Sequence, residues 1–285
     1  MQRKVGGIII SHVQTGPLLR ERRALGETRR LSPDLGITSI DVTITERGVH
    51  LPEGDLLTWA SIEEIDSSPN NCFRIQEGQA EKVLAFSEHT NRAVSLMPTM
   101  GAPTMLISGI PMHRIKGTDP YRDTLEKIKS IQPLTGEVLD TATGLGYTAI
   151  EAAKTAEHVV TVELDPTVLE IARQNPWSRN LFDNARIRQV IGDSFDVVEE
   201  LEDNRFSRVV HDPPAFSLAG HLYSGEFYAE VYRVLRGGGR LFHYVGSPDS
   251  KSGRNITHGV SKRLLAAGFS RVMKSPRAFG LVAYK

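Results

Sequence analysis

Cysteine is nearly absent from this chain of 285 residues, in which Cys72 is the single one. One cysteine excludes a disulfide within the chain and any metal cluster built from several thiolates. Nine histidines are present, but they are scattered without the paired or i, i+4 spacing of a metal-binding motif. We therefore expect no metal site.

Net charge is also absent, because 34 lysines and arginines balance 34 aspartates and glutamates. No global field then draws the protein to nucleic acid or to anionic membranes. No apolar run approaches the roughly 20 residues that span a bilayer, and residues 5–10 are too few for the core of a signal peptide. We expect a cytoplasmic protein that makes no contact with membranes.

Residues 136–150 have the pattern of a strand, a glycine loop and the start of a helix, and the later sequence continues this unit. Val138 and Leu139 form an apolar strand core, and Asp140 stands where the strand ends. Gly144 and Gly146 permit backbone angles and close approaches that other residues do not. In open α/β sheets such a loop binds ligands beside a helix N-terminus. A ligand site is predicted here.

Strands and helices alternate through residues 116–285. The apolar patterns predict strands at 158–163, 187–191, 206–211 and 240–245, and helices at 121–131, 167–174 and 256–267. A further helix is capped by Ser224 and ends at Gly237–Gly239, and two closing strands at 270–274 and 279–284 pair through a turn near Pro276. The fold class is therefore α/β, a doubly wound Rossmann-like sheet with a closing antiparallel strand. The first helix is expected to bury Leu125, Ile128 and Ile131.

Residues 1–115 form a different region, which we predict to be a small, mostly β domain before a boundary near Lys116 and Gly117. Turn signals separate short strand patterns at 38–44, 49–51, 72–75, 82–86, 93–97 and 104–107, and residues 57–65 favour a short helix. The opening segment is basic, and its cations are Arg3, Lys4, Arg20, Arg22, Arg23, Arg29 and Arg30. Such a segment can contact phosphate or form a solvated, partly helical surface.

Acidic residues stand at the ends of successive predicted strands. Glu163 follows Gly144 by 19 positions, where an acid can accept both hydroxyls of a ribose. Asp193 is placed to accept a hydrogen bond from an adenine amino group, with Ile191 or Ser194 beside the ring. Asp140 can hold a cationic amino-acid moiety. Any one such acid is often only a turn or helix cap. With Asp212 there are four acids at successive strand ends, which favours a functional role for the group.

The glycine loop also satisfies the G-x-G-x-x-A form of the nicotinamide-binding fingerprint, from Gly144 to Ala149. That motif alone is weak evidence for a dehydrogenase. Asp140 precedes the loop where a pyrophosphate would disfavour a carboxylate, and no obvious proton donor for hydride transfer follows.

The combination of motifs resembles the class I S-adenosylmethionine-dependent methyltransferases, and within them a group of predicted archaeal methyltransferases, over about residues 118–285. The segment from Leu139 to Gly146 is similar to their first motif, and the resemblance implies that Asp140, Thr141, Gly144 and Gly146 hold the methionine portion of S-adenosylmethionine. The segments that resemble the ribose-binding second motif and the adenine-binding third motif supply Glu163, Leu164, Gly192, Asp193 and Ser194.

The segment Asp212-Pro213-Pro214-Ala215-Phe216 is similar to the motif of methyltransferases that act on planar nitrogens, chiefly in nucleic-acid bases. The resemblance implies that Asp212 and the following Pro213 and Pro214 backbone bind the target amine while Phe216 stacks on the base. Ala215 and Phe216 replace the usual Tyr-Gly, which leaves the target atom open. A Pro-Pro turn capped by Asp212 is the structural alternative.

A second resemblance is to the spermidine synthase family, through residues 162–166, 191–193 and 222–228. Members of that family have the same fold as the methyltransferases, carry a small β domain at the N-terminus and transfer an aminopropyl group. The resemblance also implies that this protein is a homodimer. This sequence differs from that family at two places. The glycine-rich Gly-Gly-Gly-Asp-Gly loop of the family is replaced here by residues 140–146. The acid-rich segment that follows the fourth strand in the family contains only one carboxylate here, that of Asp212. Methyl transfer therefore ranks first.

The predicted function is methyl transfer from S-adenosylmethionine to a nitrogen, with RNA as a candidate acceptor, and the enzyme class is methyltransferase. Aminopropyl transfer and a non-catalytic cofactor- or RNA-binding module are the alternatives. A proton acceptor could come from residues near the ends of the fourth and fifth strands, namely His211, His221, Tyr223 and His243. His243 lies inside a buried strand, however, and is expected to be a packed residue.

Overall fold

The computed structural model of the chain describes residues 7–52, 54–247 and 250–285. Two of the predicted basic residues, Arg3 and Lys4, lie outside the described residues. The chain forms two compact units. One consists of the residues up to Pro120 together with Thr167–Arg179, and the other of Tyr121–Pro166 together with Asn180–Lys285.

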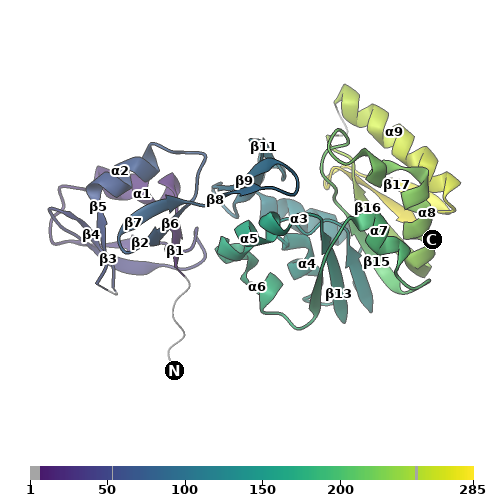
Figure 1. Cartoon of the computed structure of the whole chain (residues 1–285), viewed down its shortest axis with the longest axis horizontal. Coiled ribbons are helices and arrows are strands. Elements are labelled where there is room, and N and C mark those ends of the chain that lie inside the picture. The colour runs from purple at the N-terminus through teal and green to yellow at the C-terminus, as the bar shows by residue number, and fades with distance from the viewer. Residues whose placement is uncertain (1–6, 53, 248–249) are drawn as a thin grey trace. The chain divides into compact units, whose positions relative to one another are not determined.

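The second unit is built on a seven-stranded sheet with the order β14-β13-β12-β15-β16-β18-β17 (Figure 1). The strands are β12 (Glu137–Asp140), β13 (His158–Glu163), β14 (Ile187–Ile191), β15 (Phe206–His211), β16 (Leu235–Tyr244), β17 (Arg271–Ser275) and β18 (Gly280–Tyr284). The first five in this order are parallel, whereas β18 runs antiparallel to β16 and to β17. The predicted doubly wound sheet with a closing antiparallel strand is confirmed.

One helix precedes these strands and further helices connect them along the chain, as the crossover between parallel strands requires. They are α3 (Pro120–Ser130), α4 (Tyr147–Ala152), α5 (Pro166–Gln174), α6 (Arg179–Phe182), α7 (Ser194–Glu199), α8 (Gly225–Val234) and α9 (Lys251–Ala266), with short 3-10 turns at Pro176–Ser178 and Gly220–Tyr223. Of the connecting residues, Thr167–Arg179 belong to the first unit. The predicted buried side of α8 is confirmed, since Phe227, Tyr228, Val231 and Val234 are in the core. Ser224 caps α8 as expected, accepting a hydrogen bond from the Phe227 amide at 3.1 Å.

The glycine triplet differs from its prediction. Helix α8 ends at Val234, and Gly237–Gly239 lie inside β16 rather than closing the helix. The pairing of β15 with β16 shifts register between Phe206 and Arg208, so the glycines accommodate an irregular strand. A Cβ on Gly239 would come within 2.7 Å of the Arg236 carbonyl oxygen, which explains the need for glycine there.

Two helix predictions in this unit also need correction. Helix α9 begins five residues earlier than the predicted residue 256, because Ser250 caps it by accepting the Gly253 amide at 2.9 Å. In α3 the side chain of Leu125 is exposed rather than buried. The buried face is rotated around the helix axis from the predicted one and includes two charged residues, Asp123 and Lys127.

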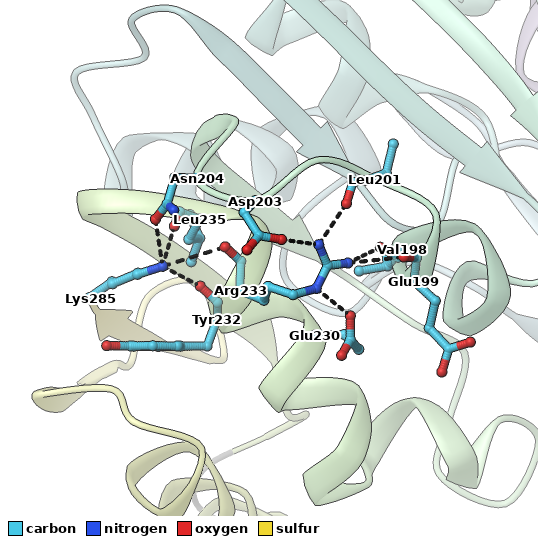
Figure 2. A network of polar contacts seen from close by, with 10 residues as sticks. All are labelled: Val198, Glu199, Leu201, Asp203, Asn204, Glu230, Tyr232, Arg233, Leu235 and Lys285. Atoms are coloured by element: carbon cyan, nitrogen blue, oxygen red, sulfur yellow. Dashed lines mark hydrogen bonds and ion pairs between the residues drawn. The ribbon is translucent and has the colours of Figure 1, made fainter.

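Two cations tie together the carboxyl ends of α7 and α8 (Figure 2). The Arg233 guanidinium donates to the carbonyls of Val198, Glu199 and Leu201 and pairs with Asp203 and Glu230. Lys285, the last residue, donates to the carbonyls of Tyr232 and Leu235 at 2.7 and 2.6 Å and to Asn204. Both cations satisfy carbonyls that a helix end leaves without partners.

The first unit contains three small sheets, with orders β2-β3-β4-β5, β1-β6-β7 and β11-β10-β9-β8. Their strands are β1 (Ile8–Ile10), β2 (Thr28–Leu31), β3 (Ile40–Ile44), β4 (Gly48–His50), β5 (Leu56–Thr58), β6 (Phe73–Gln76), β7 (Gln79–Lys82), β8 (Leu84–Ser87), β9 (Arg92–Met97), β10 (Thr104–Ile107) and β11 (Ile110–Pro111). Helices α1 (His12–Arg20) and α2 (Trp59–Asp66) bury Leu18, Trp59, Ile62 and Ile65 in the same core. The predicted β-rich region is confirmed.

Its local boundaries are less well predicted. The expected helix at 57–65 begins with strand β5 and turns helical only at Trp59, because Thr58 caps α2. The expected strand at 82–86 is divided between β7 and β8. None of the helices in the described part of the chain is long and apolar enough to cross a membrane.

Candidate functional site

The loop between β12 and α4 is organised around the carboxylate of Asp140. This carboxylate is completely buried and accepts hydrogen bonds from the hydroxyls of Thr148 and Thr161 at 2.8 and 3.1 Å and from the Ala142 amide at 3.4 Å. Burial raises the pKa of Asp140 to about 7, and the three hydrogen bonds oppose that shift. The contacts give Asp140 a role in shaping the loop, and its direct contact with a ligand stays a prediction.

The two glycines of the loop differ in what surrounds them. Gly144 has a φ of +51°, and a Cβ on it would meet no atom within 4 Å. Gly146 has a φ of +75°, and its Cβ would lie 2.6 Å from the buried Leu181 side chain. Gly146 is therefore required by packing, whereas Gly144 leaves open space beside the loop.

Glu163, at the end of β13, is joined to the glycine loop. One carboxylate oxygen accepts the Gly144 amide at 2.9 Å and the other accepts the Asp165 amide at 3.1 Å. Burial raises the pKa of Glu163 to about 7, against these backbone hydrogen bonds. Each carboxylate oxygen has a second lone pair, so two hydroxyls can still be accepted.

Exposed apolar side chains lie at the ends of β13 and β14. Glu163 pairs with Ile191 in the register of these strands, which brings Leu164 and Ile191 to the same sheet edge. Leu164 is 42% exposed and Ile191 is 51% exposed. Apolar surface at the carboxyl edge of a parallel sheet suits a flat ring such as adenine.

Asp193 and Ser194 follow β14 through Gly192. Asp193 caps α7 by accepting the Phe195 amide at 2.8 Å, and its two oxygens lie 3.2 and 3.0 Å from His221 Nε2. The buried Ser194 hydroxyl donates to the Thr141 carbonyl at 2.5 Å. The predicted third motif is thereby connected to the first one, and Asp193 already has a polar partner.

Asp212, directly after β15, has a partner that the sequence did not indicate. Lys127 Nζ lies 2.6 Å from Asp212 Oδ2 and 2.8 Å from Asp123 Oδ2. The Lys127 side chain is 2% exposed, while that of Asp212 is 18% exposed. The i, i+4 spacing of Asp123 and Lys127 was the available signal, but such pairs are usually solvated.

An aromatic residue near Asp212 is accessible. Phe216 is 54% exposed and contacts the buried Tyr223 edge to face, with ring centroids 5.3 Å apart. The Tyr223 hydroxyl donates to the Pro214 carbonyl at 3.1 Å, which fixes the segment through Pro213 and Pro214. Tyr223 therefore supports the segment that carries Asp212 and Phe216, and the contact of these two residues with an acceptor stays a prediction.

The structure contradicts the interpretation of His211 as a proton acceptor and confirms that His243 is a packed residue. His211 is fully buried between the Thr141 hydroxyl, 2.6 Å from Nδ1, and the Leu222 carbonyl, 3.0 Å from Nε2. Burial lowers the pKa of His211 to about 3 and that of His243 well below its usual value. Both are neutral packing residues. Burial also raises the pKa of Tyr223.

Comparisons with known proteins agree with this geometry. A family model described as a methyltransferase domain matches residues 138–239. The uncharacterized protein MJ1233 of Methanocaldococcus jannaschii is 47% identical over 236 residues, which are 82% of this chain and 80% of that protein. This chain belongs to the family of that archaeal protein, and its residues 138–239 match a methyltransferase domain. The residues of this methyltransferase domain include the loop of Asp140, Glu163, Asp193 and Asp212.

Other similarities of this family member are to aminopropyltransferases. A polyamine aminopropyltransferase of Sulfolobus acidocaldarius is 32% identical over 111 residues, which are 37% of each chain. A spermidine synthase solved with a transition-state analogue is 20% identical, with 73% of this chain and 76% of that chain covered and a TM-score of 0.58. The spermidine synthase of Thermotoga maritima is 19% identical, with 70% and 72% covered and a TM-score of 0.55. The two structures show a shared fold.

Proposed function

We propose that this protein transfers the methyl group of S-adenosylmethionine to a nitrogen of a planar amine. The observation that carries the proposal is the placement of Asp212 beside the glycine loop. Strand β12 pairs with β15, so that Asp140 lies opposite Val210, two residues before Asp212. The charge of Asp212 contributes, after burial, to the raised pKa of Asp140, which is consistent with a short separation.

The cofactor would lie across the carboxyl ends of β12, β13 and β14. The open space at Gly144 would take the methionine portion, Glu163 the ribose hydroxyls and Asp193 the adenine amino group. The half-exposed Leu164 and Ile191 would cover the faces of the adenine ring. His221 lies on Asp193, so the adenine amino group would have to share that carboxylate with it or displace it.

Asp212 and Phe216 would hold the acceptor. Asp212 and a carbonyl of the Pro-Pro segment accept the amine hydrogens, and the exposed Phe216 ring stacks on the acceptor plane. S-adenosylmethionine, when bound, would supply an electrophilic methyl group. The acceptor nitrogen that Asp212 and Phe216 orient would donate its lone pair to that methyl carbon, while the carbon–sulfur bonding pair would go to sulfur. The methylated nitrogen afterwards loses a proton to solvent. Positioning of this kind can supply about 7–11 kcal/mol of the barrier.

Calorimetric titration with S-adenosylmethionine and with its decarboxylated form tests the cofactor. We expect tighter binding of the intact form, because the resemblance of residues 139–146 to the first methyltransferase motif implies a site for the amino-acid portion. Transfer of labelled methyl to RNA, to protein and to small amines would then identify the acceptor class. Failure to bind S-adenosylmethionine in a folded sample would contradict the proposal.

Aminopropyl transfer is the second candidate, and the polyamine aminopropyltransferase of Sulfolobus acidocaldarius favours it through local identity. It predicts preference for decarboxylated S-adenosylmethionine and formation of a longer polyamine. Against it stands the ion pair of Asp212, since Lys127 compensates a charge that a polyammonium acceptor needs.

RNA as the acceptor, a homodimer and a cytoplasmic location remain parts of the proposal that need their own tests. The basic segment supports RNA only weakly, because Arg22, Arg29 and Arg30 are paired with acids on the same unit. Salt-dependent RNA binding that decreases in Arg20→Ala/Arg23→Ala would support it. Light scattering of the purified protein would give the oligomeric state.

A further inference from the structure

We infer that Lys127 determines the acceptor specificity, making the site select a neutral amine over an alkylammonium. The inference rests on the proposed function, because it requires that Asp212 face the acceptor. Lys127 itself acts through Asp212 and has no part in the chemical step.

The geometry isolates Lys127 from solvent while leaving Asp212 reachable. Lys127 Nζ lies between Asp212 Oδ2 at 2.6 Å and Asp123 Oδ2 at 2.8 Å, and 4.9 Å from the centroid of the Tyr244 ring. The side chains of Lys127 and Asp123 are 2% and 0% exposed. An acceptor that reaches Asp212 therefore meets a carboxylate whose other side is already bound to a cation.

The ammonium of Lys127 is charged in this setting. Burial lowers the pKa of a lysine, but the carboxylates of Asp212 and Asp123 outweigh that effect and raise the pKa of Lys127 above its usual value. A positive charge thus stands directly behind Asp212 at neutral pH. It repels a second cation at short range, where the low polarizability of the surroundings screens weakly.

A neutral amine is not repelled by Lys127 and can bind to the second carboxylate oxygen of Asp212. Within the described residues, Oδ2 of Asp212 is taken by Lys127 and no donor contacts Oδ1. That oxygen is left to accept an N–H of a planar amine. Lys127 pairs with both Asp123 and Asp212 and so reduces the net charge of these groups from −2 to −1, which weakens the attraction for a cation more than that for a neutral donor. The ion pair also keeps the carboxylate in one orientation, which favours a single acceptor geometry.

Three probes measure the charge at this site without knowledge of the natural acceptor. S-adenosylhomocysteine carries no charge at the position of the transferred methyl, whereas sinefungin carries an ammonium there. The third probe is 1,4-diaminobutane, added to protein saturated with 5′-methylthioadenosine. In Lys127→Met we expect S-adenosylhomocysteine affinity within about threefold of wild type and a sinefungin-to-S-adenosylhomocysteine affinity ratio at least tenfold higher. Binding of 1,4-diaminobutane should appear in the variant only.

Variants of opposite charge keep the test decisive if Lys127→Met fails to fold. Asp123→Asn removes a negative charge and should lower the ratio of sinefungin affinity to S-adenosylhomocysteine affinity. Lys127→Arg keeps the positive charge and should leave this affinity ratio unchanged. The double variant Lys127→Met/Asp123→Asn removes the buried pair together and should raise the ratio less than Lys127→Met does. A melting curve shows which variants are folded.

The outcomes separate the two proposals. If the wild type binds none of the cofactor analogues, the proposed function fails. If it binds them but the sinefungin ratio is the same in every folded variant, only the inference about Lys127 is overturned. A ratio that rises without Lys127 and falls without Asp123 supports it, because a merely structural role would lower both affinities together.

Discussion

Lys127 and Asp212 are 85 residues apart in the sequence, yet their side chains form an ion pair of 2.6 Å at the end of β15. The pair joins a helix that precedes the sheet to the segment that carries the proposed acceptor residues. Breaking a largely buried pair on one side leaves a charge without its partner, so the two residues should be energetically coupled.

Replacement of Asp212 by Asn should separate catalysis from cofactor binding. Methyl transfer should fall by roughly 10²-fold or more, because an amide cannot hold the acceptor in the same geometry. Affinity for S-adenosylhomocysteine, which carries no charge at the position of the transferred methyl, should stay within a few-fold. The variant should lose stability by up to about 3 kcal/mol, since Lys127 keeps only Asp123. Single-turnover methylation, titration calorimetry and denaturant unfolding measure the three quantities. Unchanged methyl transfer would contradict the role given to Asp212.

The two loop glycines offer a matched pair of substitutions. Gly146→Ala should destabilise the protein by about 2–4 kcal/mol, because the methyl group overlaps Leu181 and the φ is positive. Gly144→Ala should cost only about 1–2 kcal/mol, as its Cβ meets no atom. Cofactor affinity should nevertheless fall in Gly144→Ala, since the methyl group fills the space left for the ligand. Equal affinities in wild type and folded Gly144→Ala would place the cofactor elsewhere.

Asp140 should make the stability depend on pH. Its pKa is raised to about 7 in the folded protein, so between about pH 4 and 7 the folded state binds more protons than the unfolded state. The contribution of Asp140 to the free energy of unfolding should therefore decrease as pH rises through this range, in the same direction as that of Glu163 and against those of the buried His211 and His243. Asp140→Asn removes only the titration of Asp140, so the free energy of unfolding of the wild type relative to this variant should decrease from pH 5 to pH 7, although the substitution also weakens the loop hydrogen bonds. Urea unfolding at pH 5, 6 and 7 tests it, and an equally steep slope in Asp140→Asn would assign the dependence to another group.

The sequence predicted the parallel sheet well because β12 to β15 are short segments that contain valine or isoleucine and end within two residues of an acid. The predicted bounds of β13, β14 and β15 are those of the structure. The acids at these strand ends lie along one edge of the sheet, since the carboxyl ends of parallel strands share one edge. Their contact with a cofactor stays a prediction.

The predictions that were wrong concern residues whose structure depends on contacts with residues distant in the sequence. The buried face of α3 was displaced because Lys127 is buried by pairing with Asp212, and no local pattern indicates that partner. The glycine triplet looked like a helix end, but its glycines are needed by an irregular strand pairing. The charge of His211 likewise depends on its burial, which its position in the sequence does not reveal.

The last residue should matter for stability although it lies at the chain end. Lys285 Nζ donates to the carbonyls of Tyr232 and Leu235 and to Asn204 (Figure 2). Lys285→Ala leaves these carbonyls without their donor but keeps the backbone hydrogen bonds of residue 285 with Gly238 and Gly239, and should cost about 1–3 kcal/mol. Lys274→Ala is the matched control, because that lysine is exposed on β17. Thermal unfolding of both variants measures the difference, and equal melting temperatures would show that water replaces Lys285 without loss.

Phe216 should act on the acceptor and leave the cofactor unaffected. Its ring is more than half exposed and rests on Tyr223, so truncation removes little buried surface and should change stability by less than about 1 kcal/mol. Phe216→Ala should raise KM for a planar acceptor by roughly tenfold, the equivalent of a stacking contact of about 1–3 kcal/mol. Phe216→Trp keeps a flat ring and should retain most of the activity, whereas Phe216→Leu keeps the apolar character without the stacking face. If Phe216→Leu is as active as Phe216→Trp, the ring packs against Tyr223 only, and a planar acceptor is no longer required.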